Sequence, residues 1–331
     1  MRPQPRRLAT LLLVLLLPAQ LAWAACAGRD LSGDWDAAFR AQLDARVAHV
    51  PFAEGRFWEV RKAGRSSVLF GTIHMAEDDI ATPPPALAQR IRTADEVFVE
   101  VTRAEEQRLM RKMILNPGFI LNPEQPPTSA TLSAQEWQVL RQALGHHRVP
   151  ETLLDQMAPW YLTIALSTPP CMMAHMATGK QILDRRIETT AERAGVIVTG
   201  LEKPEDAFAV LEAVPHATQI DMLRAALVTA EMAEDYLATT KALYVRGQIA
   251  KIWAFGVIEA EIAQGATAQP AMDALYDALL VKRNDAWMKR LLPALIEGNR
   301  VVAVGALHLP GEHGLLAQLQ AQGFTVKPLV D

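Results

Sequence analysis

The sequence predicts an α/β protein that carries its functional residues at the ends of strands. Two apolar strands each run directly into a Gly-x-x-His motif, Gly71–His74 and Gly305–His308. Long helical stretches, at about 104–175 and 205–298, stand between them. Because α/β sheets bind ligands beyond the carboxyl ends of parallel strands, we expect both motifs to lie at one shared edge of the sheet, beside a helical cap or second lobe.

The first half of the predicted sheet is a hairpin followed by a βαβ unit. Residues 57–61 and 68–70 flank a polar stretch with a turn-forming glycine, which predicts a hairpin. The second of these strands leads into the first motif, so His74 is expected at the carboxyl end of a strand. A proline cluster precedes a predicted helix at 86–93, and the apolar strand 97–100 follows it.

The second half repeats the alternation of helix and strand. The predicted elements are a helix at 180–194, a strand at 196–198, a strand at 301–304, a helix at 315–322 and a strand at 324–328. The second motif directly follows the strand at 301–304. The long segments between the two halves have mainly helical patterns.

The amino-terminal residues predict a cleaved signal peptide. Arginines precede an apolar run at 8–17, and the small-residue pattern Ala22–Ala24 follows. The run has about ten residues, whereas a membrane-spanning helix needs about twenty. The alternative to a cleaved signal peptide is an uncleaved membrane anchor. No later segment is long and apolar enough to span a membrane. We expect cleavage near Ala24, a periplasmic or secreted protein, and a mature chain, 25–331, that forms a single domain with the two helical insertions.

Charge and cysteine content narrow the classes of partner. The formal net charge is −4 and no basic cluster occurs, which argues against nucleic acid or anionic lipid. The two cysteines, Cys26 and Cys171, could form a disulfide in an oxidising export compartment. The alternative is a lipidated Cys26, but Trp23 stands where an aliphatic residue is usual. The apolar helical stretches could serve a substrate cap or a homodimer interface.

The two histidines and a glutamate form the predicted site. Gly71 and Gly305 let the backbone turn and let a substrate approach closely, because they lack a Cβ atom. Glu100 closes an apolar strand and is expected beside His74. Two imidazoles and a carboxylate suit Mn²⁺, Fe²⁺, Co²⁺ or Zn²⁺ with open positions, and a neutral histidine also suits general-base catalysis. The alternative is that the histidines are structural and that Glu100 simply reaches water.

Three further polar residues are candidates for supporting roles. Glu202 ends a strand as Glu100 does, while Arg283 and Asn284 lie on a helical stretch where the arginine could clamp a substrate carboxylate. His313 follows His308, but Pro310 and the glycine after it exclude the helical His-Glu-x-x-His zinc motif. The sequence also lacks a Gly-x-Ser-x-Gly elbow, a phosphate loop and a dinucleotide-binding glycine motif.

Taken together, these segments resemble the TraB/GumN family, which includes the Tiki proteases. The resemblance rests on Leu69–His74, Phe98–Glu100, Gly200–Glu202, Arg283–Asn284 and Val302–Gly311. It implies duplicated βαβ units that form a central mixed sheet, as in the erythromycin-esterase and ChaN-like proteins. It also implies a peptidase that uses Mn²⁺ or Co²⁺. One departure is the segment Gly179–Leu183, where Gly-Val-Asp is expected before the helix.

The resemblance assigns roles to residues of this chain. His74, Glu100 and His308 become the metal-binding or catalytic set, and Arg283 and Asn284 become supporting catalytic residues. We therefore expect an exported metal-dependent hydrolase that acts on peptides or polypeptide amino termini. The alternatives are a metal-independent, esterase-like hydrolase, and a non-enzymatic periplasmic protein that binds haem or a peptide signal.

Overall fold

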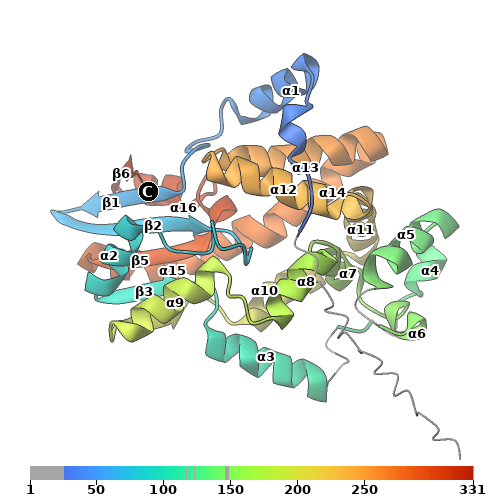
Figure 1. The fold of residues 1–331 in the computed structure, drawn as a ribbon, viewed down its shortest axis with the longest axis horizontal. Helices are drawn as coiled ribbons and strands as arrows, with labels where there is room; N and C mark the ends of the chain where they lie inside the picture. The colour runs from blue at the N-terminus through green and yellow to red at the C-terminus, as the bar shows by residue number, and fades with distance from the viewer. Residues whose placement is uncertain (1–25, 117, 119, 123, 146–148, 331) are drawn as a thin grey trace, which may run out of the picture.

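A computed structural model describes residues 26–330, except 117, 119, 123 and 146–148 (Figure 1). The predicted signal peptide therefore lies outside the described residues. No helix in the described part of the chain is long and apolar enough to cross a membrane.

A six-stranded mixed sheet organises the fold, in the order β4-β3-β5-β2-β1-β6. β4, β3, β5 and β2 are parallel, whereas β1 is antiparallel to both of its neighbours. This arrangement confirms the predicted α/β class with a mixed sheet. The strands are β1 (Phe57–Lys62), β2 (Arg65–Thr72), β3 (Glu96–Val99), β4 (Ile197–Gly200), β5 (Arg300–Gly305) and β6 (Thr325–Pro328).

The predicted hairpin is present, with a tighter turn than expected. β1 and β2 remain paired as far as Lys62 and Arg65, so that only Ala63 and Gly64 form the turn. Both turn residues have positive φ, 49° and 80°, as a two-residue turn that matches the twist of its strands requires. The polar stretch predicted as a loop therefore belongs mostly to the strands.

The two motif-bearing strands are neighbours. β2 and β5 run parallel, with Gly71 opposite Val304 and Thr72 opposite Gly305. The chain after β5 packs closely on β2, because a Cβ atom on Gly71 would lie only 2.8 Å from the Cα atom of Ala306. The sheet therefore brings the two Gly-x-x-His motifs to the same edge.

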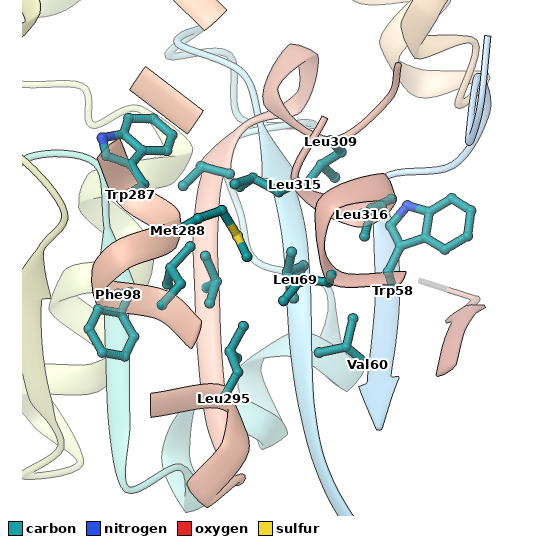
Figure 2. Packing of buried hydrophobic residues seen from close by; sticks show 14 of the residues in the cluster. Trp58, Val60, Leu69, Phe98, Trp287, Met288, Leu295, Leu309, Leu315 and Leu316 are labelled. Atoms are coloured by element: carbon teal, nitrogen blue, oxygen red, sulfur yellow. The ribbon is translucent and has the colours of Figure 1, made fainter. Parts of the chain in front are cut away.

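Helices cover both faces of the sheet. Side chains alternate along each strand, so Leu69 and Val302 pack under α15 (Lys282–Glu297) and α16 (Leu315–Ala321), as Figure 2 shows for Leu69. Val68, Phe70 and Val301 pack on the other face, under α2 (Pro85–Thr93) and α9 (Leu183–Arg193). Strands that are buried on both faces are the pattern expected of parallel sheets.

The remaining helices lie beside the sheet, mostly at the top and right of Figure 1. α3 to α8 and α10 to α14 fall in the two segments that the sequence predicted to be helical insertions. Their bounds are α1 (Ala37–Val47), α3 (Arg103–Leu115), α4 (Thr128–Thr131), α5 (Ala134–Leu144), α6 (Glu151–Leu154), α7 (Pro159–Leu166), α8 (Pro170–Ala177), α10 (Pro204–Glu212), α11 (His216–Ala230), α12 (Ala233–Val245), α13 (Ile249–Gln264) and α14 (Ala268–Tyr276).

A disulfide ties the amino-terminal segment to the helical part of the molecule. Cys26 and Cys171 are joined, with their Cα atoms 5.1 Å apart. The bond closes a loop across a sequence separation of 145 residues and connects the chain before α1 to α8. In the chain-entropy view, a cross-link over so long a loop mainly restricts the unfolded chain.

Candidate functional site

His74 lies just past the end of β2 and is held by a carboxylate from another segment. Its Nδ1 atom lies 3.2 Å from Oδ2 of Asp184, a buried residue in the first turn of α9. The Thr72 hydroxyl donates to the other oxygen of Asp184 at 2.7 Å. The charge of Asp184 raises the pKa of His74 to about 9, although 61% of the His74 side chain is exposed. The Asp184 side chain therefore fixes both the orientation of the ring and its charge.

His308 occupies the equivalent place after β5, in the short helix η6 (Ala306–His308), and it is buried. Its Nδ1 atom lies 2.7 Å from Oδ1 of Asn284. Asn284 orients its own amide by donating to the carbonyl oxygens of His308 and His313. The amide oxygen of Asn284 can only accept, so Nδ1 of His308 carries the hydrogen and Nε2 carries the lone pair. Burial lowers the pKa of His308 to about 3, so the ring is neutral.

Arg283 binds both glutamates of the site. Its Nη2 atom donates to Oε2 of Glu100 at 2.6 Å, and its Nε atom donates to Oε1 of Glu202 at 2.9 Å. Nη1 donates to the carbonyl of Leu279 and lies 3.3 Å from Nε2 of His308. The guanidinium also stacks over Trp287, 4.8 Å from the ring centre. Because its donors are engaged in this way, Arg283 is not the free substrate clamp that the sequence suggested.

Glu100 follows β3 and remains ionised although it is almost fully buried. Burial would raise the pKa of Glu100, but the charges of Arg283 and His74 and the N–H of Gly305 hold it well below the ordinary value. Its Oε1 atom accepts from Gly305 N–H at 2.6 Å and lies 3.8 Å from Nε2 of His308. Glu202 differs, because its burial outweighs Arg283 and raises its pKa.

Glu100 lines the same two cavities as His74 but makes its hydrogen bonds with Arg283 and Gly305. The sheet order places β5 between β2 and β3, so Glu100 contacts Gly305 and faces His308. A βαβ unit does not require its two strands to be adjacent, and here the second half of the chain supplies the strand between them. His74 takes its carboxylate partner from Asp184 instead.

Four of the predicted residues line one cavity of about 260 Å³. They are His74, Glu100, Arg283 and His308, and Gly305 contributes backbone. The rest of the wall is largely apolar, from Ile73, Tyr244, Ile252, Leu279, Leu280 and Leu307. A neighbouring cavity of about 200 Å³ also reaches His74, Glu100 and Asp184. His74 therefore lines both cavities.

Three predicted residues lie behind this cavity rather than in its wall. Glu202 and Asn284 are buried and act on Arg283 and His308, respectively. Gly71 is buried as well, and its missing Cβ atom makes room for Ala306 rather than for a ligand. Gly305 is similar, since a Cβ atom there would lie 3.1 Å from Oε1 of Glu100. Of the three residues predicted to contact substrate, Gly305 lines the cavity, whereas Gly71 and Glu202 do not.

The donor atoms suit a divalent cation by chemistry, although they are not gathered as a finished metal cluster. Both histidines have Nδ1 bound by a second side chain, and such outer partners are typical of metal-binding histidines. Nε2 is then the nitrogen that could bind an ion, although Nε2 of His308 here lies 3.3 Å from Nη1 of Arg283. Glu100 supplies a carboxylate in the same cavity. Within the described residues, however, no group of three or more histidine, cysteine or acidic side chains is arranged around a common point as a metal site would be.

Sequence reasoning missed Asp184, Thr72 and Trp287. Asp184 directly follows Gly179–Leu183, the segment that was identified as a departure from the expected Gly-Val-Asp. An acidic residue in the first turn of a helix is usually explained by the helix dipole, so nothing in its local pattern pointed to His74. Trp287 donates from its indole N–H to Oε2 of Glu202 at 3.0 Å, and its ring lies against His308, with centroids 4.3 Å apart.

The fold and this site define an α/β protein with two strand-end histidines at one edge of a mixed sheet. A family model described as the TraB/PrgY/gumN family matches residues 56–328, and the chain belongs to that family. It is 25% identical to the uncharacterized protein YbaP of Shigella flexneri over 261 residues, covering 77% of this chain and 88% of that protein. YbaP of Escherichia coli K12 is 24% identical over 257 residues, covering 76% and 87%.

Proposed function

We propose that the protein is a metal-dependent hydrolase that cleaves peptides, with its reaction centre at His74, Glu100 and His308. One observation carries the proposal. The two Gly-x-x-His motifs place their imidazoles in the wall of one cavity, and each ring has its Nδ1 atom fixed by a buried partner, Asp184 or Asn284. Purely structural histidines have no need of matched partners and a shared hollow.

The residues that would hold the ion are the Nε2 atoms of His74 and His308 and the carboxylate of Glu100. Neutral imidazole and carboxylate are ligands that Mn²⁺, Co²⁺, Zn²⁺ and Fe²⁺ accept. When bound, such an ion polarises a carbonyl group and lowers the pKa of its bound water to about 7. His74 must release its proton to bind, so acid competes with the ion for this ligand.

The chain's own residues prepare the site for hydrolysis. Asn284 holds His308 in the tautomer whose Nε2 lone pair could bind the ion that activates a water molecule. Arg283 keeps Glu100 ionised, so the carboxylate can orient that water through its oxygens. Asp184 can only accept, so it keeps a hydrogen on Nδ1 of His74 and leaves Nε2 as the atom that would bind the ion.

Peptides are the substrate class that the surroundings favour. The cavity is small and has an apolar wall from Ile252, Leu279 and Leu280, which suits one side chain next to the polar centre. The resemblance to the Tiki proteases points the same way. We further propose that the protein acts outside the cytoplasm, because of its signal-peptide pattern and the disulfide between Cys26 and Cys171.

A peptide-library digestion tests this function. Purified protein is stripped with a chelator, supplied with Mn²⁺ or Co²⁺, and mixed with the library, and mass spectrometry detects new peptide termini. We expect cleavage that depends on added metal and is lost in Glu100→Gln and His308→Gln. His216→Gln, on α11 and away from the cavity, is the matched control. Cleavage that is unchanged in both site variants, or absent with every metal, contradicts the proposal.

A metal-independent hydrolase is the second candidate, and one observation favours it. Nη1 of Arg283 lies 3.3 Å from Nε2 of His308 and its Nη2 binds Glu100, so a cation already neutralises the centre. In that mechanism His308 takes a proton from water and Arg283 stabilises the developing negative charge. Activity that survives exhaustive chelation would select this candidate. Tight ligand binding without turnover would instead select the non-enzymatic binding protein.

A further inference from the structure

A second cavity, of about 440 Å³, adjoins the second motif through Leu307. It lies between the loop after His308, the segment 45–51 at the end of α1, and helices α13 and α14, which are neighbours at the top of Figure 1. Its volume falls within the range of cavities that bind small molecules. None of the histidines or glutamates of the proposed reaction centre contributes to its wall.

The wall combines two aromatic rings with aliphatic side chains. Trp253 and Tyr276 face each other with ring centroids 5.1 Å apart at 65°. Both rings are only partly buried, and both line the cavity. The aliphatic part of the wall comes from Val47, Val50, Pro51, Val257, Leu307 and Pro310. Rings at such an angle offer two electron-rich faces, which attract organic cations.

The charges of the wall point to the same kind of ligand. Asp273 and Glu312 both line the cavity and are exposed. Asp273 accepts a hydrogen bond from Gln269 at 2.6 Å, and no ion pair of either carboxylate occurs in the described ranges. Arg46 and His49 are the basic residues of the wall, and the guanidinium of Arg46 binds the carboxylate of Glu261. The charge of Arg46 is therefore compensated by a residue outside the wall, which leaves Asp273 and Glu312 as the acidic groups of the wall.

The cavity shares a wall residue with the cavity of the proposed reaction centre. Leu307, the residue before His308, lines both hollows. The loop beyond His308 is fixed against the cavity's other wall, because Gly311 N–H donates to the carbonyl of Pro51 at 2.8 Å. Gly311 has a positive φ of 94°, and a Cβ atom there would lie 3.0 Å from the hydroxyl of Tyr276. A ligand in this cavity would touch the segment that positions His308.

We propose that this cavity is a second ligand site, which binds an amphipathic organic amine. The ammonium group lies between Asp273 and Glu312 over the rings of Trp253 and Tyr276, and the apolar body packs on Leu307. The inference concerns binding alone and stands whether or not the neighbouring centre is a hydrolase.

Three probes of similar shape and different charge test the site. Phenethylamine is a cation, phenethyl alcohol is neutral and hydrocinnamate is an anion, and ligand-observed NMR titration measures their binding to the full-length protein. We expect phenethylamine to bind tightest and hydrocinnamate to show no specific binding. The double variant Asp273→Asn with Glu312→Gln should weaken phenethylamine by about tenfold while leaving phenethyl alcohol unchanged, since it removes charge but keeps shape.

Two further variants locate the binding. Ala45 is exposed at the cavity's edge, so Ala45→Phe should block both phenethylamine and phenethyl alcohol without disturbing the core. Glu192→Gln, an exposed carboxylate on α9, should change nothing. If phenethylamine fails to bind the unaltered protein, or binds the double variant and Ala45→Phe as tightly as the unaltered protein, the proposed site does not exist.

Discussion

Asp184 and His74 lie 110 positions apart in the sequence and meet through one contact of 3.2 Å between Oδ2 and Nδ1. The contact joins α9 on one face of the sheet to the loop that follows β2. The two histidines of the site therefore favour different protonation states. Asp184 favours the charged form of His74, whereas burial keeps His308 neutral. A pair of titratable groups with pKa values driven apart in this way can divide acid and base roles.

Asp184→Asn should lower the pKa of His74. The substitution keeps the shape of the side chain and removes its charge, so the pKa should fall from about 9 towards its ordinary value of 6.5. An NMR titration of the His74 ring in chelator-treated protein measures the change. Thr72→Val is the control, because it removes the hydrogen bond to Asp184 but leaves the charge, and His74 should then keep a raised pKa. An unchanged titration in Asp184→Asn would show that the contact does not control His74.

Arg283→Ala should strongly destabilise the protein. The arginine compensates two buried carboxylates, Glu100 and Glu202, and removing one partner of a buried ion pair costs about 3–5 kcal/mol of unfolding free energy. Arg108 forms a comparable pair with Glu205 at the surface, where solvent weakens the interaction. Arg108→Ala should therefore have a much smaller effect. Urea denaturation measures the free energy of unfolding of both variants. Equal losses of this free energy would show that the buried ion pairs contribute no more to stability than the surface pair.

His308 should make the fold sensitive to mild acid. Its pKa is lowered from 6.5 to about 3 in the folded chain, so below pH 6.5 the unfolded chain takes up a proton that the folded chain refuses. Stability should therefore fall as the pH drops from 6.5 towards 4.5, with a limiting slope of about 1.4 kcal/mol per pH unit.

The comparison that isolates this residue is urea unfolding of the unaltered protein and His308→Gln across that pH interval. Carboxylates titrate mostly below it, so they add little to the slope. His308→Gln should lose the acid dependence, while His216→Gln should retain it. Identical slopes in all three proteins would mean that His308 is protonated in the folded chain.

Gly71→Ala should lower the stability of the protein by crowding the contact between β2 and η6. The new methyl group would approach the Cα atom of Ala306 to 2.8 Å and Leu309 Cδ1 to 3.1 Å, and overpacking of this kind costs about 1–3 kcal/mol. Gly33→Ala is the control, because a Cβ atom there meets nothing within 4 Å. Thermal unfolding of the two variants measures the difference. A Gly71→Ala protein as stable as the control would mean that β2 and η6 are not tightly packed.

The sequence predicted the strand-end positions of His74 and His308 because apolar strands and the glycines that follow them are local features. It also predicted the set His74, Glu100, Arg283 and His308, which now share one cavity. The order of strands is not local. Glu100 was placed beside His74 because a short helix joins their strands, whereas hydrogen bonding with β5 determines the actual neighbour.

The role of Asp184 could not be predicted from the sequence for a different reason. Its role depends on how α9 lies across the sheet, and α9 buries Leu183, Ile187 and Ala191 against the strands. That packing points the carboxylate at His74, although the residue reads in sequence as an ordinary acidic group in a first helical turn. The contacts of Arg283 with two glutamates could not be predicted from local sequence either, because they join three segments that are distant along the chain.

Cobalt binding tests the central claim, that His74, Glu100 and His308 form one divalent-cation site. Chelator-treated protein is titrated with Co²⁺ while the visible absorption of the bound ion is recorded. We expect one ion per chain, a spectrum that is lost in Glu100→Gln and in His308→Gln, and an unchanged spectrum in His216→Gln. A protein that binds no Co²⁺, or that binds it equally well after both site substitutions, would show that these residues do not form a metal site.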